Sequence, residues 1–295
     1  MVRLSRRAAL KSVVLAGAAA VGASSAAAST GEPTPVPADA LGLLYDATRC
    51  IGCKACVGAC REANHLPADT GLSHGLYLAP DDLSARTKNI IKLYKDRGEL
   101  SYVKRQCMHC LDPACASACM MGALKKREHG IVSWDGTRCV GCRYCQIACP
   151  YNIPKFEWNS DGGFYNPRII KCELCRERLA EGKEPACTEV CPRQAVIFGQ
   201  RAALLAEAKR RIAEHPEVYQ PEVYGEHEGG GTQVLYLSHV PFDKIGLPAL
   251  TEESLPHMVH KVQGTIYKGF VAPVALYGVL AAVITRNTRK PEEPS

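Results

Sequence analysis

Cysteine is the residue that most constrains the fold of this chain. Its 295 residues include sixteen cysteines, and all of them fall into four runs of four. The first and third runs have the spacing C-x2-C-x2-C-x3-C, the second C-x2-C-x4-C-x3-C, and the fourth C-x2-C-x11-C-x3-C. The runs are Cys50, Cys53, Cys56 and Cys60; Cys107, Cys110, Cys115 and Cys119; Cys139, Cys142, Cys145 and Cys149; and Cys172, Cys175, Cys187 and Cys191.

This spacing suits a cubane metal cluster. A [4Fe-4S] cubane presents four iron corners, and a tight loop with a thiolate at every third residue can wrap three of them. In two-cluster ferredoxins the fourth cysteine of a run binds the neighbouring cluster, so the metals join paired runs. Four such runs predict four [4Fe-4S] clusters with all sixteen cysteines as iron ligands.

Other uses of cysteine compete with this interpretation. An even number of cysteines in an exported chain is often a disulfide framework, although these compact runs would need many short, crowded loops. Zinc bound by four cysteines usually joins two C-x2-C pairs across a longer gap, which only the fourth run resembles. Attached c-type haem needs C-x-x-C-H, and the residues that follow the pairs are Lys54, Leu111 and Arg176.

Composition supports cohesion from something besides apolar packing. The chain has five Phe, two Trp and 6% aromatic residues, which is little for its length. Its formal net charge is +6 at pH 7, but four of the basic residues precede position 12. The remainder therefore carries little net positive charge, and we expect no nucleic-acid partner.

The N-terminus has the pattern of an export signal. The stretch SRRAALK at residues 5–11 precedes an Ala-rich apolar run that ends in small residues near Ala28. Paired Arg6 and Arg7 in this context are typical of the twin-arginine route, which carries folded proteins. We predict a cleaved signal peptide at 1–28 and a Pro-rich linker at 29–40, with an uncleaved N-terminal anchor as the alternative.

Local patterns predict regular structure around the cysteine runs. Ile131 to Trp134 precedes the third run as a short strand, and Ala195 to Phe198 follows the fourth run as another. The apolar residues Leu204, Ala208 and Ile212 recur every four positions and predict an amphipathic helix at residues 200–215. A further strand is expected at residues 233–237.

The C-terminal region contains an apolar stretch. Residues 269–285 carry no charge, and Lys268 precedes them while Arg286, Arg289 and Lys290 follow. At about 1.5 Å per residue they cover less than the ~30 Å hydrocarbon core, and extension back to Ile266 closes the gap. We predict a transmembrane helix at 266–285 with a basic cytoplasmic tail at 286–295; a buried core helix is the alternative.

The chain resembles the four-cluster ferredoxin-like subunits of membrane-bound oxidoreductases, including those of molybdopterin reductases, formate dehydrogenases and periplasm-facing nickel–iron hydrogenases. The resemblance rests on SRRAALK, CMHCLDPAC, CVGCRYCQIACPYNIPKF and YGEHEGGGTQVLYLSHVPFDKIGLP, and it spans nearly the whole chain. An export signal on the chain itself favours the hydrogenase branch.

The resemblance implies an α+β fold of two interleaved ferredoxin-like modules at 41–199, followed by an extension at 200–265. It pairs the first run with the fourth and the second with the third. The implied ligand sets are Cys50, Cys53, Cys56 with Cys191; Cys172, Cys175, Cys187 with Cys60; Cys107, Cys110, Cys115 with Cys149; and Cys139, Cys142, Cys145 with Cys119.

The expected function is electron transfer within a larger complex. The sequence offers no acid–base pair or nucleophile, so we expect no catalysis by this chain alone. The implied partners are the small and large hydrogenase subunits, an integral membrane subunit that reduces quinone, and the lipid bilayer at the periplasmic face of the inner membrane. A relay for a formate dehydrogenase or molybdopterin oxidoreductase is one alternative, and an exported binding module stabilised by disulfides or zinc is another.

Overall fold

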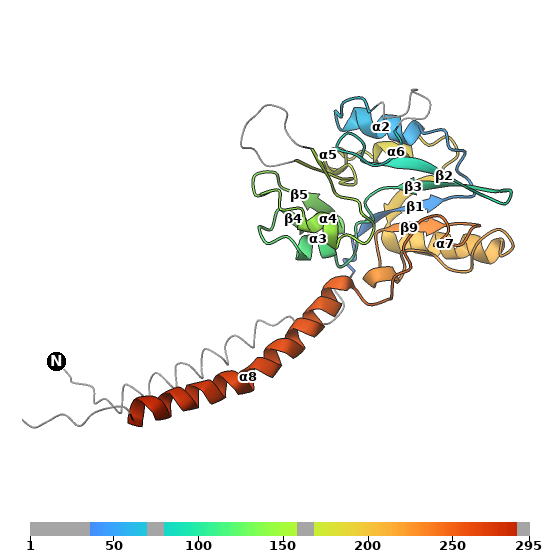
Figure 1. Ribbon diagram of the computed structural model, residues 1–295. Helices are drawn as coiled ribbons and strands as arrows, with labels where there is room; N and C mark the ends of the chain where they lie inside the picture. Colours follow the sequence, from blue (N-terminus) through green and yellow to red (C-terminus); the bar gives the residue numbers. More distant parts are fainter. Residues whose placement is uncertain (1–35, 70–79, 158–167, 288–295) are drawn as a thin grey trace, which may run out of the picture. The chain divides into compact units, whose positions relative to one another are not determined.

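The computed structural model describes residues 36–69, 80–157 and 168–287, and Figure 1 shows how their elements are arranged. The described residues belong to one compact unit, Pro33–Ser295. The predicted signal peptide at 1–28 and most of the predicted linker at 29–40 lie outside the described residues.

The largest sheet joins three segments that are far apart in the sequence. Strand β1 (Leu41–Asp46) pairs antiparallel with β8 (Val196–Gln200) and parallel with β9 (Val234–Leu237). In this register Tyr45 lies opposite Val196 on one side and Tyr236 on the other. The sheet therefore combines strands from the predicted core with one from the predicted extension.

Different elements cover the two faces of this sheet (Figure 1). Leu44, Leu235 and Leu237 face helix α7 (Arg201–Glu214) and pack against its Leu204 and Ala208. On the opposite face, the side chains of Leu43, Tyr45, Val234 and Tyr236 join a core with Cys56 of α2 (Ala55–Ala63) and Cys187 of α6 (Ala186–Glu189). The alternation of side chains along each strand thus directs one set to α7 and the other to the cysteine runs.

Two short antiparallel strands, β4 (Leu124–Lys126) and β5 (Val132–Trp134), lie between the second and third runs in the sequence. The second run includes α3 (Ala114–Ser117) and precedes β4, while the third follows β5 and includes α4 (Tyr144–Ala148). A turn, η2 (Glu128–Gly130), joins the strands. We call residues 107–149 the inserted module, and the first and fourth runs with their elements the outer module.

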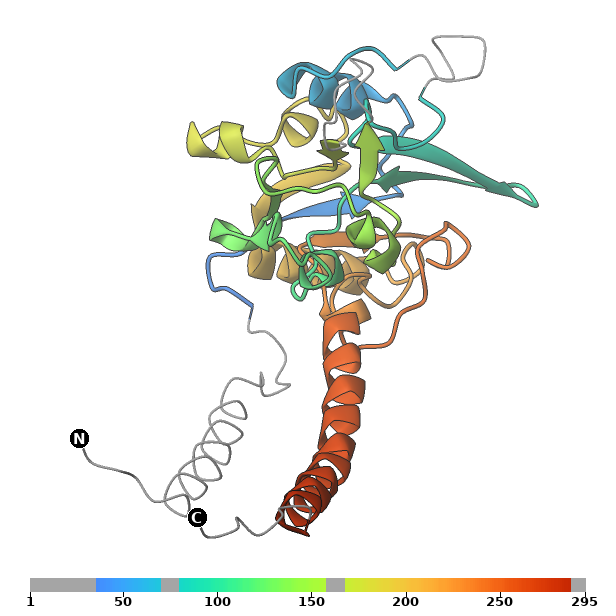
Figure 2. The same ribbon diagram turned by 60° about the vertical axis from the view of Figure 1, so that its left-hand side comes forward.

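Two hairpin-like pairs complete the cysteine-rich part of the chain. Strands β2 (Ile90–Asp96) and β3 (Glu99–Arg105) form a long antiparallel pair that extends outward in Figure 2. Strands β6 (Lys155–Glu157) and β7 (Arg168–Ile170) form a shorter pair before the fourth run, whose first pair of cysteines is followed by α5 (Arg176–Ala180). The sequence patterns described above did not predict either pair.

A buried charged network secures α7 to the sheet. The Asp46 carboxylate is fully buried and accepts hydrogen bonds from Arg211 at 3.0 Å and from the Tyr219 hydroxyl at 2.9 Å. The backbone N–H of Thr48 donates to the same carboxylate at 3.0 Å. The observed bounds of α7 confirm the helix predicted at residues 200–215.

The last helix, α8 (Leu255–Asn287), begins after the turn η3 (Glu228–Gly230) and strand β9. Just before α8, the Ser254 hydroxyl donates to the Asp112 carboxylate at 2.5 Å. Among the described residues, the structure contains no helix with both the length and the apolar character needed to cross a membrane. The side chains of 261–273, 275 and 276 lie outside the described part, so the transmembrane helix predicted at 266–285 is not confirmed.

Candidate metal centres

The sixteen cysteines form no disulfide. Their mutual influences divide them into four groups, each drawn from two runs. The groups are named site 1 (Cys50, Cys53, Cys56, Cys191), site 2 (Cys60, Cys172, Cys175, Cys187), site 3 (Cys107, Cys110, Cys115, Cys149) and site 4 (Cys119, Cys139, Cys142, Cys145). Each site combines three cysteines of one run with the fourth cysteine of its partner run.

In the outer module, the thiols that shift one another's pKa are those of a single group. Burial raises the pKa of Cys56, and the charges of the other three thiols of site 1 raise it further against the opposing effect of Lys104. The pKa of Cys187 is raised to about 12, first by burial and then by the other three thiols of site 2, with Lys104 again opposing. Thiols separated by more than a hundred residues in the sequence therefore lie together.

The inserted module shows the same grouping. Burial raises the pKa of Cys110 well above its usual value, and the other three thiols of site 3 add to the rise. The pKa of Cys145 is raised to about 11 by burial and then by the other three thiols of site 4. The structure thus brings together the four cysteines of each set implied by the sequence resemblance, and their role as iron ligands stays a prediction.

The four cysteine loops share an unusual backbone conformation. The residue before the second cysteine of each run has a positive φ: 69° at Gly52, 48° at His109, 69° at Gly141 and 54° at Leu174. Backbone N–H groups near such left-handed residues form concavities that favour anions, including iron–sulfur clusters. At Gly52 a side chain is also excluded by space, since a Cβ atom would lie 2.2 Å from the ring of Tyr102.

The last cysteines of two runs receive equivalent hydrogen bonds. The backbone N–H of Ala123 donates to Cys119 Sγ at 3.2 Å, and that of Ala195 donates to Cys191 Sγ at 3.3 Å. Each donor lies four residues after its cysteine, just before β4 or β8. Hydrogen bonds to the sulfurs are one determinant of cluster potential, so the two modules repeat this contribution.

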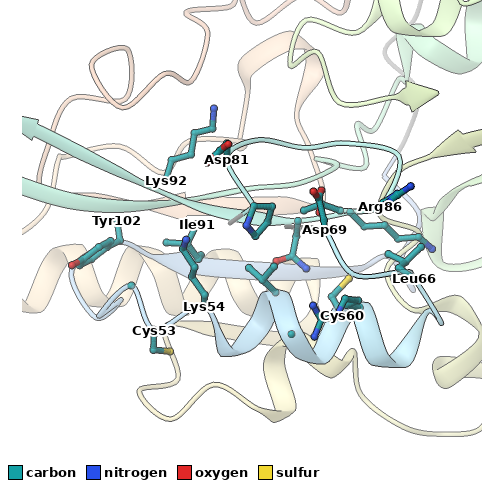
Figure 3. A pocket seen from close by; sticks show the side chains of 18 of the residues that line it. Cys53, Lys54, Cys60, Leu66, Asp69, Asp81, Arg86, Ile91, Lys92 and Tyr102 are labelled. Carbon is teal, nitrogen blue, oxygen red and sulfur yellow. The ribbon is translucent and has the colours of Figure 1, made fainter. Parts of the chain in front are cut away.

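Site 1 encloses a cavity. Its four cysteines line the cavity together with Tyr45, Ile91, Lys104 and Pro192. A separate groove of about 850 Å3 lies beside it, between α2 and the β2–β3 pair (Figure 3). Cys53 of site 1 and Cys60 of site 2 line this groove, which approaches both sites of the outer module.

The chemistry of the thiols fits an iron–sulfur cluster. Burial alone keeps such thiols protonated, as the pKa of about 12 at Cys60 indicates, whereas a bound metal deprotonates a coordinating thiol. Within the described ranges, no group of three or more His, Cys, Asp or Glu side chains is placed to hold a metal ion. A cubane instead takes each thiolate on a different iron, so its ligands surround a volume rather than converge on one point.

Charged side chains that act on two sites indicate which sites are neighbours. Lys104 lies close to Cys56 of site 1 and to Cys60, Cys172 and Cys187 of site 2. Cys107 of site 3 is influenced by Cys172 of site 2, and Cys115 of site 3 by Cys145 of site 4. These influences support the order 1, 2, 3, 4 for the sites, which the cysteine spacing did not predict.

Two buried lysines beside the sites were also missed by the sequence analysis. Lys104 is fully buried on β3, and Lys171 is 3% exposed just before the fourth run. The Lys171 ammonium donates to the backbone oxygen of Val132 and, at 3.1 Å, to that of Cys172. The available signal was their position one to three residues before a cysteine run.

Comparison with known proteins agrees with this site geometry. Residues 99–201 match the family model described as "4Fe-4S dicluster domain". The hydrogenase-2 operon protein HybA of Shigella flexneri is 42% identical over 290 residues, covering 86% of this chain and 87% of that protein. The iron-sulfur subunit of the nitrate-inducible formate dehydrogenase of the same organism is 36% identical, with 81% and 80% covered. The chain therefore belongs to the family of iron–sulfur proteins that includes hydrogenase-2 operon protein HybA and the formate dehydrogenase iron-sulfur subunits.

Proposed function

We propose that sites 1 to 4 each hold one [4Fe-4S] cluster and that this chain relays electrons from a periplasmic nickel–iron hydrogenase to a membrane subunit that reduces quinone. The observation that carries the proposal is the succession of four complete groups of thiols, each beside the next. When bound, each cluster supplies a centre that accepts and releases one electron. The residues of the chain fix the spacing of these centres and shield them from water.

The ends of this succession differ from its middle. Cys53 of site 1 and Cys142 of site 4 are exposed, whereas Cys187 of site 2 and Cys107 of site 3 are buried. An electron entering or leaving from another protein must reach an accessible site, because tunnelling slows steeply with distance. Sites 1 and 4 are therefore the proposed contacts with partners.

Apolar side chains around site 4 support a partner contact there. The exposed fractions are 76% at Met120, 81% at Ile147 and 51% at Tyr144, and Val140 is also exposed. Large apolar residues gathered on one surface are typical of protein interfaces. The same residues flank three of the four cysteines of site 4 in the sequence.

The hydrogenase is the proposed catalytic partner because the hydrogenase-2 operon protein is more similar to this chain than the formate dehydrogenase subunits are. The predicted twin-arginine signal on the chain itself supports the same choice. A formate dehydrogenase as partner is the second candidate. Identification of the catalytic subunit that co-purifies with the chain distinguishes them.

Location at the periplasmic face of the inner membrane is part of the proposal. The residues at 5–11 support export of the folded protein, and the uncharged stretch at 269–285 supports attachment to the bilayer. A chain ending at Lys261 is expected to appear as a soluble brown protein in the periplasm. Its retention on membranes that lack the partner subunits would contradict attachment through the C-terminal residues.

Replacement of one ligand tests the relay itself. Cys172→Ser is expected to lower hydrogen-dependent quinone reduction by more than about tenfold, since site 2 lies within the path and its ligand set becomes incomplete. Hydrogen oxidation with a soluble dye should persist, because the dye takes electrons directly from the catalytic partner. Thr188→Ser, which keeps a hydroxyl next to Cys187, serves as the control and should retain both activities.

The comparison uses variants shown to be exported and assembled with their partners. Normal quinone reduction by assembled Cys172→Ser would contradict a path through site 2. If the complex that contains the unaltered chain does not oxidise hydrogen, the hydrogenase is not the partner and the formate dehydrogenase becomes the proposed partner.

A further inference from the structure

Lys104 occupies a position that is unusual for a lysine. It lies on β3 opposite Ile91 of β2, and none of its surface is exposed. The Tyr236 hydroxyl donates to the backbone oxygen of Lys104 at 2.6 Å, which connects β3 to the central sheet formed by β8, β1 and β9. The strand therefore holds the Lys104 side chain inside the molecule rather than at its surface.

The ammonium of Lys104 has no hydrogen-bond partner among the described residues. A buried charge in this state is costly unless an opposite charge compensates for it. Its side chain lines the cavity of site 1 together with the four cysteines of that site, and Lys54 and Arg193 also line this cavity. Burial by itself lowers the pKa of Lys104, but the negative charges of Cys187, Cys56, Cys60 and Cys172, which a bound metal keeps deprotonated, outweigh burial and raise the pKa.

We propose that Lys104 is a charge-compensating residue shared by sites 1 and 2, whose fixed ammonium raises the reduction potentials of the clusters at both sites. The inference rests on the proposed occupancy of the sites. A positive charge favours the reduced state, which carries one more negative charge than the oxidised state. Charge and burial are among the properties that set cluster potentials.

The other buried lysine, Lys171, acts on a different site from Lys104. The Lys171 ammonium donates to two backbone oxygens, and its charge opposes the rise in the pKa of Cys107 and Cys115 of site 3. No cation is among the main influences on Cys145 of site 4. The clusters at sites 1 and 2 should therefore respond together to a change at position 104, and the other two should not.

The test is a redox titration of the full-length chain, monitored by electron paramagnetic resonance after anaerobic purification. In Lys104→Met, the equilibrium constant for one-electron reduction should fall by roughly tenfold or more for two of the four clusters. A tenfold fall corresponds to a shift of about 59 mV to lower potential. Lys104→Arg keeps the charge and should restore the original potentials. Lys92→Met, which removes a half-exposed lysine of the adjoining strand β2, should leave all four couples unchanged.

Measurement of the iron content of each variant separates a change of potential from loss of a cluster. Unchanged potentials in a fully iron-loaded Lys104→Met variant would overturn the inference, as would equal shifts of all four couples. If Lys104→Met loses about half of its iron while Lys104→Arg and Lys92→Met keep theirs, the charge is required for sites 1 and 2 and the inference holds. Equal loss from Lys104→Arg would show that only packing matters. Absence of iron from the unaltered chain would reject the proposed function itself, which is a separate result.

Discussion

The layer between α7 and the central sheet and the core of the inserted module are held together by different means. The α7 layer consists of Leu44, Leu204, Ala208, Tyr219, Val223, Leu235 and Leu237, and it contains no cysteine. The core of the inserted module includes Cys139 and Cys145 as buried members and Cys115 and Cys119 at its edge. Its remaining apolar side chains are few, and its strands have three residues each.

This difference indicates which part of the chain depends on metal. Each buried Leu of the α7 layer contributes about 1.5–3 kcal/mol through removal of apolar surface from water. In the inserted module, ligand side chains take the place of such residues, and binding of a structural metal contributes directly to folding. One chain thus combines a region stabilised by side-chain packing with a region stabilised by its cofactors.

Iron removal should produce the largest contrast between the two regions. Chelation under anaerobic, reducing conditions is expected to lower amide protection in residues 107–149 by at least about a hundredfold, because their core loses its central component. The amides of α7 and β9 should keep most of their protection. Hydrogen exchange followed by mass spectrometry measures both regions in one experiment. Equal loss of protection in the two regions would contradict the comparison.

The buried network under α7 should give the next largest effect. Arg211→Met removes the buried cation from the Asp46 carboxylate and leaves only the half-exposed Arg49 at 3.6 Å, which is expected to cost up to about 3–5 kcal/mol in the free energy of unfolding. Urea unfolding of the iron-loaded protein measures the change. Arg210→Met is the matched control, since Arg210 is exposed and should matter little. A similar loss of unfolding free energy in both variants would show that burial of the Asp46–Arg211 pair does not determine its contribution to stability.

Truncation of one apolar side chain in the α7 layer should have a smaller effect. Leu204 is 4% exposed, and Leu204→Ala is expected to lower stability by about 2–4 kcal/mol through lost burial and the cavity left behind. Iron content should not change, because no cysteine contacts this layer. Leu93→Ala, at a position that is 56% exposed, provides the comparison. Loss of iron from Leu204→Ala would show that packing and metal binding are not separate.

The smallest expected effect concerns pH. Hydrogen bonds from Arg210 and Arg211 lower the pKa of Glu207 from its usual 4.5 to about 2. A lowered carboxyl pKa stabilises the folded state above pH 4.5, and this contribution disappears as the pH falls from about 4.5 to about 2. Glu207→Gln should cost less than about 1 kcal/mol at pH 7, because solvent screens the pair. The difference from the unaltered chain should vanish at low pH; a difference that persists there would contradict the assignment.

Sequence reasoning was most successful where the information is local. The four-residue repeat of Leu204, Ala208 and Ile212 predicted α7. The cysteine spacing predicted a compact loop at each run, and cluster binding by these loops stays a prediction. The position of β9 beside β1 was not predicted, because parallel pairing across nearly two hundred residues leaves no local pattern. The burial of Lys104 was also missed, since a lysine in a strand normally indicates a solvent-facing position.

The order of the sites could not be predicted for a related reason. Spacing within a run specifies which thiols wrap one cluster, but it carries no information on which runs lie side by side. That arrangement follows from the β8–β1 and β4–β5 pairs, which set the two modules, and from the proximity of Cys107 to Cys172. The membrane span predicted at 266–285 stays a prediction.

The most direct test of the four-site account is the iron and acid-labile sulfide content of the full-length chain purified without oxygen. Four complete sites predict about sixteen iron and about sixteen sulfide per chain, with no disulfide among the cysteines. Zinc in place of iron, the absence of sulfide, or thiols oxidised in pairs would contradict the account. About eight iron and eight sulfide per chain would show that only one of the two modules is a cluster-binding module.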